Sequence, residues 1–289
     1  MTTSSMCGTS LGNSTEPSPP TLLLKLDISK AFDSVRWDYL LSLMQRRGFP
    51  MRWCNWISAL LSTSTSRIML NGTPLDPIQH GRGLRQGDPL SPLLFILAID
   101  PLHRLLQIAT ERGLLSKLNG RAARFRVSMY ADDAVIFLKP TARDVSNIKE
   151  LLINFGMVTG LHTNLQKTSV TPIGCTNIDI EPILANLPVA RASFPLKYLG
   201  LPLTPRRLCK LDFQPLIDKA VEKLSTWNGR SLTQAGRACL TKSVLSSQPV
   251  YLMTALKPPK EVLLEVDKIH KCFLWAGNNA ISGDKCKIK

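Results

Sequence analysis

Two adjacent aspartates, Asp132 and Asp133, lie between two runs of strand-like composition, residues 124–129 and 134–138. This pattern predicts a β-hairpin with both carboxylates at its tip. Like charges held so close together are unfavourable unless a cation offsets them, although aspartate is also an ordinary turn residue. The pair therefore indicates either a plain turn or a cation site.

A third aspartate favours the cation site. Asp27 closes the hydrophobic run of residues 22–26, where a charge has no packing role. Three carboxylates from two strand ends could hold two divalent metal ions about 4 Å apart, the arrangement that stabilises the attacking and leaving oxygens in phosphoryl transfer. Magnesium suits such a site because it binds few protein carboxylates and keeps water and phosphate ligands.

The elements around these aspartates predict an α+β fold followed by helices alone. Residues 1–20 are rich in Ser, Thr and Pro and predict a flexible N-terminal segment. Asn71-Gly72 predicts a tight hairpin turn, and Tyr198 to Leu201 a second turn between short strands. Helices are predicted at residues 34–47, 52–61, 91–109 and 141–155, and then at 211–227, 233–247 and 260–275.

Charge indicates a polyanionic partner. The 289 residues carry a formal net charge of +15, and residues 190–289 hold 17 Lys and Arg against 7 Asp and Glu. A basic module of this kind fits nucleic acid or an anionic membrane. No run of about 18 apolar residues or secretory signal is evident, which disfavours a membrane partner and secretion. The seven scattered cysteines argue against a disulfide scaffold and a structural zinc site, so an intracellular location, nuclear or cytoplasmic, is expected.

Five segments in sequence order resemble the successive motifs of reverse transcriptases. They are residues 26–35 (LDISKAFDSV), 83–92 (GLRQGDPLSP), 130–133 (YADD), 160–167 (GLHTNLQK) and 196–200 (LKYLG). The basic helical tail is similar to that of plant-type LINE (non-LTR) retrotransposon polymerases. A single motif of this kind is weak evidence, but five in order are strong.

The resemblance implies a fold and a domain organisation. Residues 21–204 would form the reverse transcriptase palm, an antiparallel sheet backed by helices. Residues 205–289 would form a basic, all-α thumb. Relatives carry a fingers region before the first motif, so we expect the fingers to be largely missing and the chain to be a fragment of a longer reading frame.

The resemblance also assigns catalytic roles. Asp27, Asp132 and Asp133 would bind two Mg²⁺ ions, which Mn²⁺ could replace, with the Ile28 carbonyl as a further ligand. Lys167 matches the lysine that protonates the departing pyrophosphate as a general acid.

Further residues match the substrate-binding positions of the family. Phe32 matches the steric gate that selects deoxynucleotides. Without the surrounding motif, a phenylalanine at this position would be read as a core residue. Gln86 and Gly87 match the loop near the nucleotide and template, and Arg85 would meet phosphate. The turn that grips the primer is matched by Tyr198, Leu199 and Gly200, and contacts to duplex phosphates are implied for Arg230, Arg237 and Lys242.

The implied activity is RNA-directed DNA polymerisation, with an RNA template, a DNA primer and deoxynucleoside triphosphates. Two alternatives stay open. One is a catalytically inactive nucleic-acid-binding remnant, which the missing fingers and the basic tail would suit. The other is a different two-metal enzyme with a similar sheet, such as a nucleotidyl cyclase, against which the Gln86-Gly87 loop argues.

Overall fold

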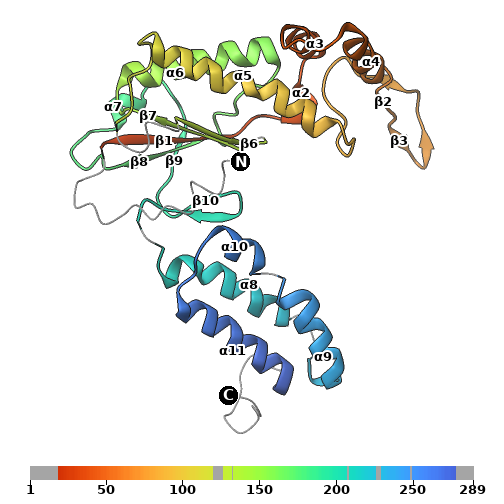
Figure 1. The fold of residues 1–289 in the computed structure, drawn as a ribbon, viewed down its shortest axis with the longest axis vertical. Coiled ribbons are helices and arrows are strands. Elements are labelled where there is room, and N and C mark those ends of the chain that lie inside the picture. The colour runs from red at the N-terminus through yellow and green to blue at the C-terminus, as the bar shows by residue number, and fades with distance from the viewer. Residues whose placement is uncertain are drawn as a thin grey trace. The chain divides into compact units, whose positions relative to one another are not determined.

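A computed structural model describes residues 19–119, 126–131, 133–206, 208–225, 229–247 and 249–277. Its contacts divide the chain into two compact units, which meet between Ser193 and Phe194. The first unit holds a sheet with helices, and the second a short hairpin with helices (Figure 1). The division falls before the expected boundary at residue 204, because the hairpin of residues 196–203 groups with the helices that follow it. Most of the expected N-terminal segment, residues 1–18, lies outside the described residues.

The first unit is built on a five-stranded sheet. Its strand order is β6-β7-β1-β8-β9, and every neighbouring pair is antiparallel except β8 with β9. The antiparallel palm-type sheet is therefore confirmed. The strands are β1 (Thr21–Leu26), β6 (Val127–Tyr130), β7 (Asp133–Leu138), β8 (Ser169–Ile173) and β9 (Ala190–Arg191).

Helices cover one face of this sheet, where α5 and α6 lie across it (Figure 1). The helices of the first unit are α2 (Ala31–Ser34), α3 (Trp37–Arg46), α4 (Met51–Ser62), α5 (Ser91–Glu111), α6 (Ala142–Thr159) and α7 (Glu181–Leu184). The single helix predicted for residues 34–47 was wrong. The chain is extended at Arg36, whose backbone N–H donates to the carbonyl of Thr159 (2.9 Å), so α2 and α3 are separate.

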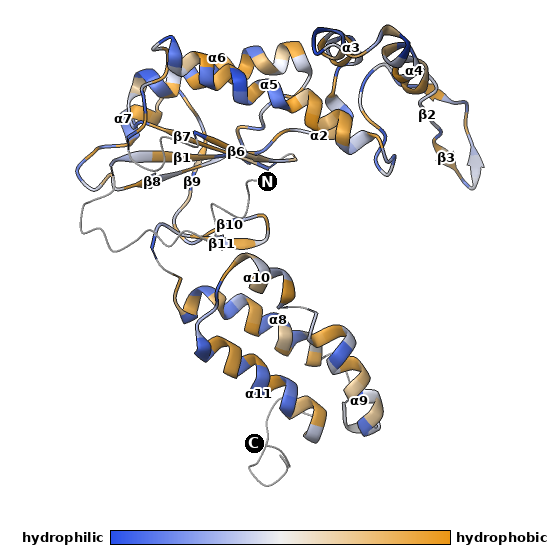
Figure 2. Ribbon diagram, viewed as in Figure 1, coloured by the Kyte–Doolittle hydropathy of each residue, from blue (hydrophilic) through white to orange (hydrophobic). Residues whose placement is uncertain are grey.

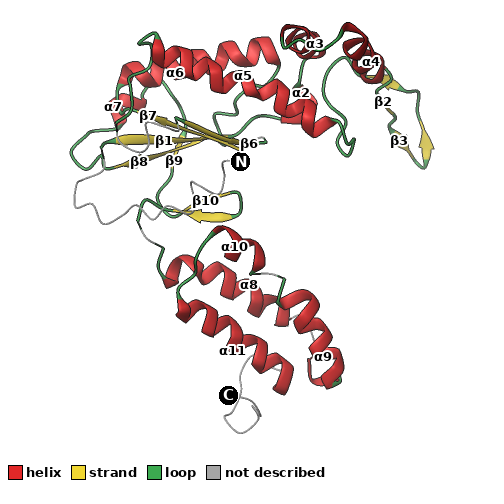
Figure 3. Ribbon diagram, viewed as in Figure 1, coloured by secondary structure: helices red, strands yellow, loops and turns green. Residues whose placement is uncertain are grey.

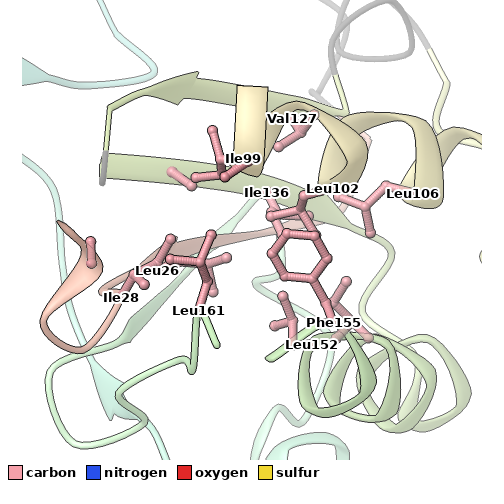
Figure 4. Packing of buried hydrophobic residues seen from close by; sticks show 14 of the residues in the cluster. Leu26, Ile28, Ile99, Leu102, Leu106, Val127, Ile136, Leu152, Phe155 and Leu161 are labelled. Carbon is pink, nitrogen blue, oxygen red and sulfur yellow. The ribbon is translucent and has the colours of Figure 1, made fainter. Parts of the chain in front are cut away.

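Alternate residues of the central strand face the helices. Leu22, Leu24 and Leu26 belong to the main hydrophobic core, whereas the intervening Leu23 does not. Figure 4 shows Leu26 and neighbouring strand residues packed with side chains of α5 and α6. Because side chains alternate along a strand, the next odd-numbered residue, Asp27, points to the opposite face.

Helix α5 is the one described helix that is long and apolar enough to cross a membrane by length and composition. Its buried side chains Phe95, Leu102 and Leu106 pack in the core, which accounts for its apolar character. The helix begins at Ser91, as predicted, and its N-cap residue is Leu90. The carboxylate of Asp88, just before this helix, accepts from the N–H of Leu90 (2.9 Å).

Two small ribbons lie between α4 and α5. Strands β2 (Thr65–Ser66) and β5 (Ile78–Gln79) pair with each other, as do β3 (Met69–Leu70) and β4 (Thr73–Pro74). The φ angles of Asn71 (50°) and Gly72 (82°) are both positive, as a type I′ turn requires. The predicted Asn-Gly turn is confirmed.

The second unit is predominantly helical, as predicted (Figure 3). Its elements are β10 (Leu196–Tyr198), β11 (Leu201–Leu203), η2 (Lys210–Phe213), α8 (Gln214–Ser225), η3 (Gly229–Ser231), α9 (Gln234–Leu240), η4 (Thr241–Leu245), α10 (Val250–Ala255) and α11 (Lys260–Ala276). Phe213, Leu245 and Phe273 are buried in its own core. The helices alternate apolar and polar residues along their length (Figure 2), as expected for amphipathic helices with one buried face.

Candidate active site

Asp27 and Asp133 lie at the ends of neighbouring strands. The antiparallel register of β1 and β7 pairs Leu26 with Ala134, so the next opposed positions are Asp27 and Asp133. Residues directly opposed in an antiparallel pair project from the same face of the sheet. Both aspartates are half-buried. The structure thus brings together two of the three predicted carboxylates, and the third, Asp132, lies outside the described residues.

The hairpin that carries Asp133 is as predicted. Tyr130 pairs with Asp133 across a two-residue connection, which begins with Ala131 at a positive φ of 51°. This backbone conformation is uncommon for a residue other than glycine. In the described part of the chain, no three or more His, Cys, Asp or Glu side chains cluster as metal ligands. The pair of Asp27 and Asp133 still supplies the hard oxygen donors that divalent ions such as Mg²⁺ prefer.

A loop between α6 and β8 is bonded to the end of strand β1. The N–H of Asn164 donates to the carbonyl of Asp27 (2.8 Å), and the N–H of Ser29 donates to the carbonyl of His162 (2.9 Å). The backbone N–H and carbonyl groups of the intervening Ile28 therefore point away from this loop. Lys167 is exposed in the same loop, so the predicted general acid belongs to the segment that contacts Asp27.

One contact in this loop was not predicted. The hydroxyl of the buried Thr168 accepts from the N–H of Asp27 (3.3 Å). Thr168 directly follows the motif that ends at Lys167, and this adjacency was the signal that the sequence offered. Strand β8 was missed because Pro172 lies within it, and proline argues against a strand that is bonded on both sides.

Glycine is required where the loop begins. Gly160 has a φ of +85°, and a Cβ at this position would lie 2.0 Å from the carbonyl oxygen of Ser34. The close approach lets the C-terminal end of α6 meet the segment that follows α2. It also fixes the start of the loop that contacts Asp27.

Phe32 is half-buried rather than fully part of the core. Its ring stacks on that of Phe95, with centroids 4.6 Å apart and an interplanar angle of 15°. Its carbonyl accepts from the N–H of Leu84 (2.7 Å), which joins the segment after Asp27 to the loop of residues 83–87. The core contact and the partial exposure are both compatible with a gating role.

The loop that carries Arg85, Gln86 and Gly87 is held by side-chain contacts. The Gln86 side-chain amide donates to the carboxylate of Asp33 (3.4 Å). Arg85 donates to the hydroxyls of Thr63 (2.9 Å) and Ser64 (3.2 Å) at the end of α4. Gly87 is exposed with a φ of +91°, and a Cβ there would meet nothing within 4 Å. The structure brings this loop beside Phe32 and Asp33.

In the second unit, the predicted primer-gripping turn is a two-residue hairpin connection. Tyr198 pairs with Leu201, and Leu199 and Gly200 between them have positive φ angles of 51° and 77°. The hydroxyl of Tyr251, on α10, donates to the carbonyl of Leu199 (2.6 Å). Tyr251 was not predicted as a functional residue, because nothing in the sequence relates it to a turn some fifty residues earlier.

The predicted phosphate contacts of the second unit lie on or beside α9. Arg237 is half-buried, and its Nε atom is buried with no hydrogen-bond partner among the described residues. Lys242 is exposed in η4. The backbone of Arg230 lies in η3, and its side chain is outside the described part of the structure.

A helix-backed antiparallel sheet with paired aspartates at adjacent strand ends is the arrangement expected of a polymerase palm. Residues 3–203 match the family described as reverse transcriptase (RNA-dependent DNA polymerase). The chain belongs to this family, whose members are enzymes that depend on divalent metal ions.

The relatives include proteins of non-LTR retrotransposons. The chain is 28% identical over 262 residues to the transposon TX1 uncharacterized 149 kDa protein of Xenopus laevis, covering 90% of this chain and 20% of that protein. It is 26% identical over 191 residues to the Pol polyprotein of the retrotransposable element R2DM of Drosophila melanogaster, covering 63% and 17%. The R2 Pol polyprotein of Nasonia vitripennis is 37% identical over 111 residues, covering 38% and 10%. The chain thus spans a fifth or less of the length of these relatives.

Among solved structures, the chain is similar to telomerases. The telomerase of Candida tropicalis in complex with a fragment of telomeric RNA has a TM-score of 0.48 and 9% identity, covering 91% of this chain and 44% of that one. An apo form of the same telomerase has a TM-score of 0.43 and 13% identity, covering 55% and 32%.

Proposed function

We propose that this chain carries out RNA-directed DNA synthesis, extending a DNA primer on an RNA template with deoxynucleoside triphosphates. The observation that carries the proposal is the opposed position of Asp27 and Asp133 at the ends of β1 and β7. Membership of the reverse transcriptase family supports it. A metal-binding pair at two strand ends on one face of a sheet suits phosphoryl transfer.

Two Mg²⁺ ions, or Mn²⁺ in their place, would be held by Asp27 and Asp133, together with Asp132. The backbone carbonyl of Ile28 points away from the loop of residues 160–168 and would add a further oxygen ligand. Oxygen donors on neighbouring strands fit ions of this kind. When bound, the ions would stabilise the attacking and leaving oxygens of the displacement.

The remaining residues would position the substrates and move a proton. Phe32, fixed by Phe95, would exclude a ribose 2′-hydroxyl, and Gln86 and Gly87 would lie against the nucleotide and template. The primer 3′-hydroxyl oxygen forms a bond to the α-phosphorus while its proton passes to solvent water, and the bond from that phosphorus to pyrophosphate breaks. Lys167 would donate a proton to the departing pyrophosphate.

Primer extension by the purified chain, with a primed RNA, deoxynucleoside triphosphates and Mg²⁺, tests the proposal. Asp133→Asn should abolish extension, whereas Glu150→Gln, the same charge change at an exposed site on α6, should leave it unchanged. Absence of extension by the parent, or equal extension by Asp133→Asn, would refute the proposal. Salt-dependent binding of primer–template without extension would instead support a non-catalytic nucleic-acid-binding protein.

A further inference from the structure

Helix α4 exposes two tryptophans on its solvent side. Trp53 is 38% exposed and Trp56 is 53% exposed, whereas Cys54, Ile57 and Leu61 anchor the other side of the helix in the core. The two indole rings meet edge to face with centroids 5.9 Å apart. Since the helix is already anchored, these rings are not needed for its packing, and exposed aromatic clusters often mark binding surfaces.

An arginine completes this cluster. The guanidinium of Arg52 lies over the ring of Trp56, 4.7 Å from its centroid. Such a cation–π contact orders both side chains and presents a flat, positively charged surface. We call Arg52, Trp53 and Trp56 the α4 platform.

The chain segment that carries the α4 platform has a surplus of positive charge. Residues 36–82 contain six arginines, no lysine and two aspartates. Two of these arginines are neutralised by ion pairs, Arg36 with Asp38 and Arg47 with Asp100. Within the described residues no ion pair engages the other four, which are Arg46, Arg52, Arg67 and Arg82. Flat rings with surplus positive charge suit a partner with both bases and phosphates.

We propose that the α4 platform binds single-stranded nucleic acid, and that its occupant is the unpaired template ahead of the polymerisation site. This inference rests on the proposed function. Bases stack on aromatic rings and on guanidinium planes without regard to sequence, and arginines neutralise the backbone. A template that is copied along its length needs binding of this sequence-tolerant kind.

The position of the α4 platform relative to the loop of residues 83–87 supports the template as its occupant. Trp56 and Thr63 are seven residues apart and therefore lie on one side of the helix, separated by about 10 Å along its axis. The Thr63 hydroxyl accepts from Arg85, at the loop expected to contact the templating base. Stacked nucleotides are about 3.4 Å apart, so a strand that runs along α4 covers the 10 Å in about three nucleotides. A base on Trp56 would then be about three positions ahead of the base at that loop.

Binding of a short fluorescently labelled oligouridylate, followed by anisotropy, tests the platform directly. Trp56→Ala should weaken binding about tenfold, because stacking on one aromatic ring is lost. Trp56→Phe should stay near the parent affinity, and so should Leu93→Ala, the control at a side chain on α5 that is 60% exposed. Arg52→Ala should lower the slope of log affinity against log salt by about 0.7, whereas Trp56→Ala should leave the slope unchanged.

The effect of template length on the KM for primer–template tests whether the occupant is the unpaired template. In primer extension, Trp56→Ala should raise the KM for primer–template only when the unpaired template is longer than about three nucleotides. With a single unpaired nucleotide, the variant should match the parent.

If Trp56→Ala binds the oligouridylate as tightly as the parent, the inference is overturned. If sedimentation also shows that the substitution changes self-association, the surface contacts a second copy of the chain instead. If the parent binds the oligouridylate and the tryptophan variant does not, but neither extends a primer, then the proposed function fails and the platform stands.

Discussion

The aromatic rings of Phe32 and Phe95 stack with centroids 4.6 Å apart. Phe95 is 1% exposed in the middle of the core, whereas Phe32 is half-buried and lies five residues after Asp27. One face of Phe32 is therefore fixed by a residue that cannot move freely. The ring is held in one orientation beside the proposed nucleotide site.

This relationship predicts how sugar selection would change. Phe32→Val should raise the use of ribonucleoside triphosphates relative to deoxynucleoside triphosphates, because the smaller side chain leaves room for the 2′-hydroxyl. Phe95→Leu should raise it less, since the gating ring remains but loses its stacked support, at a stability cost of about 1 kcal/mol. Competition between the two triphosphates at a single templated position measures the ratio. An unchanged ratio in Phe32→Val would contradict the gating role.

Alanine substitutions at two glycines with almost the same φ can distinguish the cost of backbone strain from the cost of a steric clash. Gly160 (φ +85°) would place a Cβ 2.0 Å from Ser34, and Gly48 (φ +84°) would place one in open space. Gly48→Ala should cost about 1 kcal/mol through strain alone. Gly160→Ala should cost about 3 kcal/mol or more, because the clash is added. Urea denaturation of both variants gives the comparison, and equal losses would show that the close approach is unimportant.

The sequence allowed the aspartate site to be predicted because local signals determine it. Asp27 ends an apolar run and Asp133 lies between two strand-like runs, so both strand ends can be recognised without distant contacts. The break at Arg36 could not be predicted, since its bonding partner, Thr159, is more than a hundred residues away. Thr141 caps α6 by accepting from the N–H of Asp144, but the Asp144 carboxylate bonds Ser116, 28 residues earlier, a contact that no local pattern indicates.

The second unit contains a histidine that should make its stability depend on pH. His270, on α11, has its Nε2 atom buried without a hydrogen-bond partner among the described residues, and burial lowers the pKa of this imidazole. A lowered pKa in the folded state means that protonation favours unfolding. The stabilisation is present above the unfolded-state pKa of about 6.5 and is lost as the pH falls below it.

His270→Gln should remove this part of the pH dependence. Urea denaturation at about pH 7.5 and about pH 5.5 should show a larger loss of stability in the parent than in the variant. Nearby carboxylates titrate in both proteins, so only the difference between the two losses reports on His270. Equal losses would mean that the half-buried imidazole of His270 does not resist protonation.

Tyr251 is expected to position the hairpin turn of Leu199 and Gly200, which we propose contacts the primer. Tyr251→Phe removes the hydroxyl that donates to Leu199 and should cost about 1 kcal/mol of stability. In primer extension it should raise the KM for primer–template more than it lowers kcat, because the turn is loosened while the aspartates are untouched. Met253→Leu, an exposed change on the same helix, is the control. A fall in kcat alone would contradict a positioning role.

The central claim is that Asp27 and Asp133 act together on shared metal ions. A double-variant cycle in Mg²⁺-dependent primer extension tests it most directly, with Asp27→Asn, Asp133→Asn and the combined variant. Residues that act as one unit are strongly non-additive, so each single variant should lose at least about a thousandfold in rate and the double variant little more. A double variant whose loss is the product of the two single losses, or either single variant at the parent rate, would contradict the account.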